Sequence, residues 1–135
     1  MSLRVQPIRV LIVDDDVDAA QSLCLLLRTM GCEAAVTYDG AEGLALAGRF
    51  EPELAIIDLE MPGMKGREMV KHLRLQEAGA LAMAVCLTGQ PVDEERPAKL
   101  GDGFDMFVRK PMVHDALAEI LARARSLAQR QVGTK

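Results

Sequence analysis

A carboxylate stands at the end of an apolar run near the middle of the chain. Residues 54–57, Leu-Ala-Ile-Ile, have the pattern of a buried strand, Asp58 follows directly, and a Met-Pro-Gly turn comes next. Burying an unpaired carboxylate is costly, so such a group normally takes up a proton, pairs with a cation or binds a metal. The sequence therefore predicts a partner for Asp58 elsewhere in the chain.

Other apolar runs end in polar residues of complementary types. These are Asp14, Asp15 and Asp16 after residues 8–13, Thr88 at the end of residues 81–88, and Arg109 and Lys110, which Pro111 follows, after residues 104–108. Carboxylates are hard oxygen ligands that suit Mg²⁺ with retained waters. A hydroxyl and an ammonium group can contact the oxygens of a phosphoryl group, and a carboxylate can attack phosphorus to form an acyl phosphate. These residue types favour phosphoryl transfer to Asp58.

Strand and helix patterns alternate along the chain. Apolar runs and periodicity predict strands over residues 8–13, 32–37, 54–58, 81–88 and 104–108, and helices over 18–30, 41–47, 65–76, 92–100 and 114–130. Pro97 predicts that the fourth of these helices is short or irregular. Five strands alternating with five helices indicate a doubly wound α/β domain. In such a domain the carboxyl ends of the parallel strands lie at one edge of the sheet, and ligands bind there.

Composition narrows the classes of function. The chain has 135 residues, a size typical of one domain. Its net charge of −4 argues against direct nucleic acid binding, and no apolar run approaches the ~20 residues of a membrane span. Three cysteines without CxxC spacing are typical of core residues in a reducing compartment, so we expect a cytoplasmic protein without membrane insertion.

Four motifs carry a resemblance to a known family. The segments "VLIVDDD", "AIIDLEMPGMKG", "CLTG" and "FVRKP" occur in this order, and over residues 8–125 the chain resembles the receiver domain of two-component response regulators. The resemblance implies a flavodoxin-like (βα)5 three-layer sandwich with a five-stranded parallel sheet in the order 2-1-3-4-5. It also implies domain bounds of 8–126, with residues 1–7 as an N-terminal extension and 127–135 as a helix end and tail.

The resemblance assigns roles to matching positions. They are Asp58 as phosphoacceptor and metal ligand, Asp15 as a direct ligand of Mg²⁺ (or Mn²⁺), Asp14 as a ligand through water, the backbone carbonyl of Glu60 as a further ligand, Thr88 and Phe107 as the switch pair, Lys110 as the lysine that contacts the phosphoryl group, and Pro111 as a structural proline. Two departures are Phe rather than Tyr at the switch position and Lys65 where Asp is more usual. Glu60 and Gln90 are expected to influence the lifetime of the phosphoryl group.

Partners are likewise implied by the resemblance. The donor would be a histidine kinase or a histidine phosphotransfer protein. The responsive surface would be formed by the fourth helix, the fifth strand and the last helix, whose apolar stripe also permits a homodimer. The domain would act as a signalling receiver that catalyses its own phosphorylation and dephosphorylation, either alone or within a larger regulator. The stretch over residues 87–111 is most similar to receivers of hybrid histidine kinases.

Two other classes of function stay open. Phosphatases of the haloacid dehalogenase type also begin with a strand that ends in Asp-x-Asp, and Asp14 and Asp16 would then be nucleophile and acid. That hypothesis leaves the motif around Asp58 unexplained, and Asp16 is better suited to cap the following helix. The other class is a receiver-like interaction module that signals without phosphorylation.

Overall fold

The computed structural model describes residues 6–89 and 103–133. Its elements, in chain order, are β1 (Arg9–Val13), α1 (Val17–Thr29), β2 (Glu33–Thr37), α2 (Gly40–Phe50), β3 (Leu54–Asp58), α3 (Gly66–Leu75), β4 (Met83–Thr88), β5 (Met106–Arg109) and α5 (His114–Gly133). The helix expected over residues 92–100, and Gln90, lie outside the described residues.

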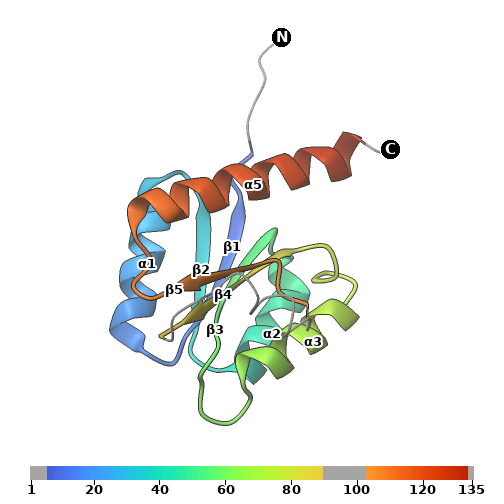
Figure 1. Cartoon of the computed structure of the whole chain (residues 1–135). Helices are drawn as coiled ribbons and strands as arrows, with labels where there is room; N and C mark the ends of the chain where they lie inside the picture. Colours follow the sequence, from blue (N-terminus) through green and yellow to red (C-terminus); the bar gives the residue numbers. More distant parts are fainter. Residues whose placement is uncertain (1–5, 90–102, 134–135) are drawn as a thin grey trace.

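All five strands pair in parallel, in the order β2-β1-β3-β4-β5, which confirms the predicted topology. α1 and α5 cover one face of the sheet, and α2 and α3 cover the other (Figure 1). The register places Asp58 beside Leu87 and Thr88 beside Arg109. The strands therefore bring polar residues that are distant in the sequence to the same edge of the sheet.

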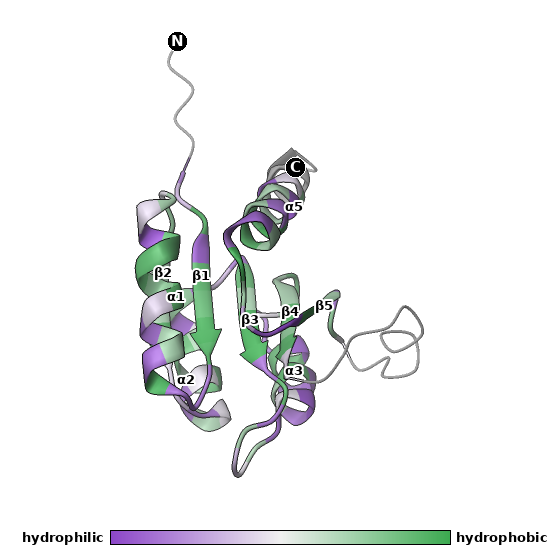
Figure 2. Ribbon diagram, turned by 60° about the vertical axis from the view of Figure 1, so that its left-hand side comes forward, coloured by the Kyte–Doolittle hydropathy of each residue, from purple (hydrophilic) through white to green (hydrophobic). Residues whose placement is uncertain are grey.

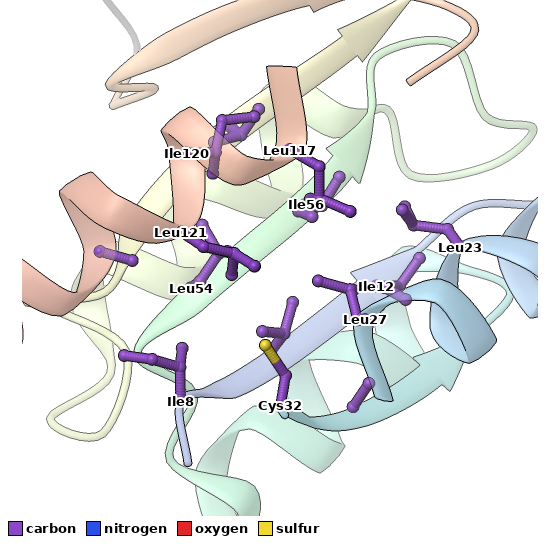
Figure 3. Close-up of a cluster of buried hydrophobic side chains, with 14 of the residues drawn as sticks. Ile8, Ile12, Leu23, Leu27, Cys32, Leu54, Ile56, Leu117, Ile120 and Leu121 are labelled. Atoms are coloured by element: carbon purple, nitrogen blue, oxygen red, sulfur yellow. The ribbon is translucent and has the colours of Figure 1, made fainter. Parts of the chain in front are cut away.

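The central strands are buried on both faces, so they appear as apolar runs in the sequence (Figure 2). Alternate residues of β1 point to opposite layers: Val10 and Ile12 pack with α1 and α5, while Leu11 and Val13 pack with α2 and α3. Figure 3 shows the first of these layers, in which side chains of α1 and α5 meet those of β1 and β3. Two aliphatic layers thus hold the strand ends in place.

Some helix bounds differ from the predicted ones. α2 continues past the expected end at residue 47 to Phe50, because Gly48 occupies an exposed helical position, and the helix ends where Glu51 takes a left-handed φ of 54°. α5 extends three residues beyond the expected end at residue 130. α1 begins after Asp16, whose carboxylate accepts a hydrogen bond from the Ala19 amide at 3.1 Å.

The described residues 6–89 and 103–133 contain no helix long and apolar enough to cross a membrane. The three cysteines, Cys24, Cys32 and Cys86, are buried and form no disulfide bond with one another. Burial raises the pKa of Cys32 above its ordinary value, and the charge of Arg125 only partly opposes this shift. The cysteines therefore serve as core side chains.

Candidate functional site

Three carboxylates meet where β1 and β3 end. Asp14 and Asp58 are each only 3% exposed, whereas Asp15 is exposed, and one oxygen from each of the three lies within 4.8 Å of the others. The Asp14 amide donates to the Thr37 carbonyl at 3.2 Å, which ties the end of β1 to the end of β2. Neighbouring parallel strands thus hold like charges close together, an arrangement that is unfavourable without a compensating cation.

Lys110 supplies a positive charge to this cluster. Its Nζ lies 3.1 Å from Oδ1 of Asp58 and 3.7 Å from Oδ2 of Asp14. The lysine follows β5 directly, and its backbone amide donates to the Thr88 carbonyl at 2.8 Å. Pairing between β4 and β5 therefore fixes the backbone from which the ammonium group reaches the two carboxylates.

The surroundings of Asp58 raise its pKa, and burial is the largest cause. Burial raises that pKa to about 6; the hydrogen bond from Lys110 opposes the shift, and the negative charge of Asp14 adds to it. For Lys110, burial alone would lower the pKa, but the hydrogen bond and charge of Asp58, with the charges of Asp14 and Asp15, raise it. One ammonium group does not offset three carboxylates, and hard oxygen donors at this spacing fit a divalent cation such as Mg²⁺.

The backbone around Asp58 is held from both sides. The Leu59 amide donates to the Leu87 carbonyl at 2.8 Å, and the Glu60 amide lies 3.3 Å from Asp58 Oδ1. α3 begins at Gly66, where an added Cβ would fall against the carbonyl oxygen of Asp58 and 2.9 Å from the Cα of Leu59. Sequence reasoning missed this role of Gly66, although a glycine at the start of a helix was a usable signal.

Asp16 and Lys65 lie at the margin of the cluster. Asp16 caps α1 and is not among the three grouped carboxylates. It is therefore poorly placed as the second acid of a haloacid dehalogenase-type phosphatase. The Lys65 ammonium lies 3.9 Å from the exposed carboxylate of Glu60, and the Lys65 amide lies 3.4 Å from a carboxylate oxygen of Glu68. Lys65 thus contacts the rim of the site rather than its buried oxygens.

The predicted switch residues lie on neighbouring strands. Thr88 ends β4 and is 1% exposed, whereas Phe107 in β5 is partly exposed. The Phe107 ring packs edge to face on Phe104, with ring centroids 5.4 Å apart and an interplanar angle of 65°. The sequence predicted Phe104 as the first residue of this strand and gave it no role, but the strand begins at Met106 and Phe104 precedes it. The peptide bond between Lys110 and Pro111 is cis.

A groove opens beside the carboxylates, between α1 and residues 110–112, which connect β5 to α5. It has a volume of about 480 Å³. Its lining is formed by Asp14, Asp16, Ala19, Ser22, Leu23, Leu26, Leu87, Lys110, Pro111 and Met112. The groove is thus polar where it meets the acidic cluster and mainly apolar farther along α1.

Most of the chain is similar in sequence to known proteins. The model of the response regulator receiver domain family matches residues 10–122. The transcriptional regulatory protein PrrA of Mycobacterium tuberculosis is 38% identical over 127 residues, which cover 93% of this chain and 52% of that protein. The response regulator MprA of a Mycobacterium species is 36% identical over 92% of this chain and 52% of its own length. The chain spans about half the length of the curated relatives it matches.

Solved structures show the same arrangement of elements. The chemotaxis protein CheY4 of Vibrio cholerae superposes with a TM-score of 0.80 at 30% identity, covering 87% of this chain and 98% of that one. The receiver domain of a sensor histidine kinase from Pseudomonas aeruginosa, solved with magnesium coordinated in its active site cleft, gives a TM-score of 0.79 at 23% identity, with coverages of 89% and 98%. The second likeness concerns the fold alone.

Proposed function

Because this chain belongs to the response regulator receiver domain family, we propose that Asp58 accepts a phosphoryl group from a phosphohistidine of a partner protein. The observation that carries the proposal is the placement of Asp58. Its buried carboxylate lies in a cluster with Asp14 and Asp15, and the Lys110 ammonium is 3.1 Å from its Oδ1. A purely structural carboxylate would gain nothing from two further acidic neighbours.

The transfer follows from these residues. A carboxylate oxygen of Asp58 attacks phosphorus, the phosphorus–nitrogen bond of the phosphohistidine breaks, and its electron pair returns to the imidazole nitrogen. Lys110 already lies beside Asp58, so its ammonium can contact a phosphoryl oxygen without a large movement. Attack of water on the phosphorus of the acyl phosphate would later release inorganic phosphate and restore the carboxylate. We assign Thr88, at the adjacent end of β4, as the hydroxyl that hydrogen-bonds another phosphoryl oxygen.

The acidic cluster is suited to hold Mg²⁺ or Mn²⁺. We assign Asp15 and Asp58 as direct ligands, Asp14 as a ligand through water, and the Glu60 carbonyl as a further donor. A bound divalent cation would supply positive charge for the phosphoryl oxygens. The Asp58 carboxylate is also oriented without a cation, because the Glu60 amide lies 3.3 Å from its Oδ1.

We further propose that phosphorylation changes the surface that includes β5 and α5 together with the helix predicted over residues 92–100. Thr88 and Lys110 are linked across the β4–β5 pairing, because the Lys110 amide donates to the Thr88 carbonyl at 2.8 Å. Phe107 lies in the same short strand as the residues leading to Lys110. Movement of Thr88 toward a phosphoryl group would therefore act on Phe107.

The partner would be a histidine kinase or a histidine phosphotransfer protein, and we propose that it covers the groove beside α1. A donor must bring its phosphohistidine to Asp58, and the groove begins at Asp14 and Lys110. Its apolar part, which includes Leu23, Leu26 and Met112, would bury surface against a partner. A cytoplasmic location, a homodimer through α5, the absence of direct nucleic acid binding and membership of a hybrid kinase or a larger regulator stay predictions.

Intact mass spectrometry after incubation with Mg²⁺ and acetyl phosphate tests the proposal. We expect one phosphoryl adduct on the wild type and none on Asp58→Asn. Asp16→Asn is the matched control, because Asp16 lies outside the group of three carboxylates, and it should keep the adduct. An adduct that survives in Asp58→Asn would show that another residue is the phosphoacceptor.

Two further outcomes separate the alternatives. Turnover of a generic phosphate ester, lost in Asp14→Asn and kept in Asp58→Asn, would favour a phosphatase. A wild type without an adduct, under conditions that label a known receiver, would be examined by beryllofluoride binding, because beryllofluoride mimics an aspartate-bound phosphoryl group. Absence of binding would favour an interaction module that works without phosphorylation.

A further inference from the structure

Phe107 is in contact with a second aromatic ring that precedes its strand. Its ring meets Phe104 edge to face with centroids 5.4 Å apart, a favourable geometry for two aromatic rings. Met106 and Val108 pack in the layer of α1 and α5, whereas Phe104 packs in the layer of α2 and α3. The ring contact is therefore made on the α2 and α3 side, apart from the main α5 core.

Phe104 is anchored on both sides of its own backbone position. The Arg74 guanidinium, on α3, donates to the Gly103 carbonyl at 2.7 and 3.1 Å and to the Asp105 carboxylate at 2.9 Å. The same carboxylate accepts a hydrogen bond from the Ala84 amide at 2.8 Å, and the Asp105 amide donates to the Ala84 carbonyl at 2.8 Å. α3 and β4 thus hold the residues that flank Phe104.

Arg74 makes further hydrogen bonds that strengthen its hold on the residues flanking Phe104. Arg74 also donates to the carbonyls of Ala80 and Ala82, which precede β4, so one side chain joins the approaches to β4 and β5. Its side chain is 24% exposed, and hydrogen bonds made by a charged, largely buried group exceed neutral ones in strength. Phe104 is thereby fixed to the scaffold, while Phe107 remains partly exposed on a short edge strand.

We propose that Phe104 is a positioning residue that holds the Phe107 ring in its unphosphorylated position and so sets how readily the domain switches. The inference rests on the proposed function, in which Phe107 moves when Asp58 is modified. Because Arg74 keeps Phe104 in place, a displaced Phe107 ring must give up the ring contact. The contact therefore favours the unswitched state and opposes binding of any ligand that requires the switched one.

Ring-resolved NMR tests this inference without substitution. The chain contains three phenylalanines and no tryptophan, so a sample with ¹³C-labelled phenylalanine rings gives signals from Phe50, Phe104 and Phe107 alone. Saturation with Mg²⁺ and beryllofluoride should shift the signals of both Phe104 and Phe107. Phe50, in α2, is outside this ring contact and serves as the internal reference.

The outcomes distinguish the positioning role from the proposed function. Shifts at Phe107 without shifts at Phe104 would overturn the positioning role and leave the switch intact. Unmoved Phe107 signals in a protein that binds beryllofluoride would overturn the switch and the positioning role together, while phosphorylation of Asp58 would stand. Asp58→Asn should show no ring shifts under the same conditions.

Substitution gives a second, quantitative test. Phe104→Leu keeps an apolar side chain but removes the ring, and it should tighten beryllofluoride binding by about 2- to 12-fold, the range that corresponds to one aromatic pair. Loss of the adjacent Phe104 ring current moves the free Phe107 signals in any case, so the discriminating readout is the tighter binding, which a merely structural role would not cause. Phe50→Leu is the matched control and should change neither quantity. Equal or weaker binding by folded Phe104→Leu would contradict the inference.

Discussion

The Nζ of Lys110 lies 3.1 Å from Oδ1 of Asp58, although 51 residues lie between them in the sequence. The contact depends on three neighbouring strands, since β3 pairs with β4 and β4 pairs with β5. The same ammonium is 3.7 Å from Asp14 Oδ2. Lys110 therefore offsets negative charge in the resting site, and its proposed contact with an incoming phosphoryl group is a second role that experiment can separate from the first.

Lys110→Ala should impair phosphoryl transfer while strengthening cation binding. Loss of one preorganised donor costs about 10²-fold in rate, so labelling by acetyl phosphate should slow by about that factor. The acidic cluster loses its competing positive charge, and Mg²⁺ should bind more tightly in a fluorescence or calorimetric titration. A variant that loses both activities would instead indicate a damaged fold. Lys110→Arg is the conservative control.

Thr88→Ala should separate phosphorylation from switching. Thr88 ends β4 beside Arg109, so its loss leaves the carboxylates and Lys110 in place. We expect the variant to keep the phosphoryl adduct, with most of the beryllofluoride-dependent displacement of the Phe107 ring signals lost. Thr88→Ser retains the hydroxyl and should behave like the wild type. Full ring displacement in Thr88→Ala would remove Thr88 from the switch.

Asp58→Asn should stabilise the cation-free protein at neutral pH. The pKa of Asp58 is raised from 3.8 to about 6 by burial and by the charge of Asp14, a value that already includes the opposing effect of Lys110. The folded state then binds more protons than the unfolded state between these values, so ionisation of Asp58 costs stability as pH rises through this window. At one pKa unit per ~1.4 kcal/mol, the gain in Asp58→Asn should be on the order of 1–3 kcal/mol above pH 6.

The pH dependence provides the check on this prediction. Below the unfolded-state pKa of 3.8, Asp58 is mostly protonated in both the folded and the unfolded state. The ionisation of Asp58 then no longer lowers the free energy of unfolding of the wild type relative to Asp58→Asn. Urea denaturation in EDTA at pH 7.5 and near pH 3.5 measures both limits. If the wild type and Asp58→Asn had equal free energies of unfolding at each of the two pH values, the ionised Asp58 carboxylate would not destabilise the folded protein.

Gly66→Ala should destabilise the domain and displace the backbone of Asp58. The added Cβ would meet the Asp58 carbonyl and the Leu59 Cα, which are backbone atoms that cannot rotate away. A cost of about 1–3 kcal/mol is typical of overpacking, and thermal denaturation with the Mg²⁺ titration would reveal both effects. Gly48→Ala is the matched control, since an added Cβ there meets nothing within 4 Å. It should stabilise α2 by about 0.5–1 kcal/mol.

Much of the fold was accessible from the sequence because burial leaves a pattern. β1 and β3 are buried on both faces, and their apolar runs predicted strands close to the observed bounds. α2 was predicted too short because Gly48, treated as a helix end, is an exposed residue within the helix. A glycine can stand either at the end of a helix or within it, so the residue type alone does not decide where the helix ends.

The sequence by itself determined which groups stand at the strand ends, because a βα alternation produces parallel strands whose carboxyl ends share one edge. Asp14, Asp58 and Thr88 could be placed there from apolar runs alone. Only the tertiary structure decided which atoms meet: the shared contact of Lys110 with two carboxylates and the packing of Phe107 on Phe104. These contacts depend on register and on side-chain direction across several elements, and local periodicity carries neither.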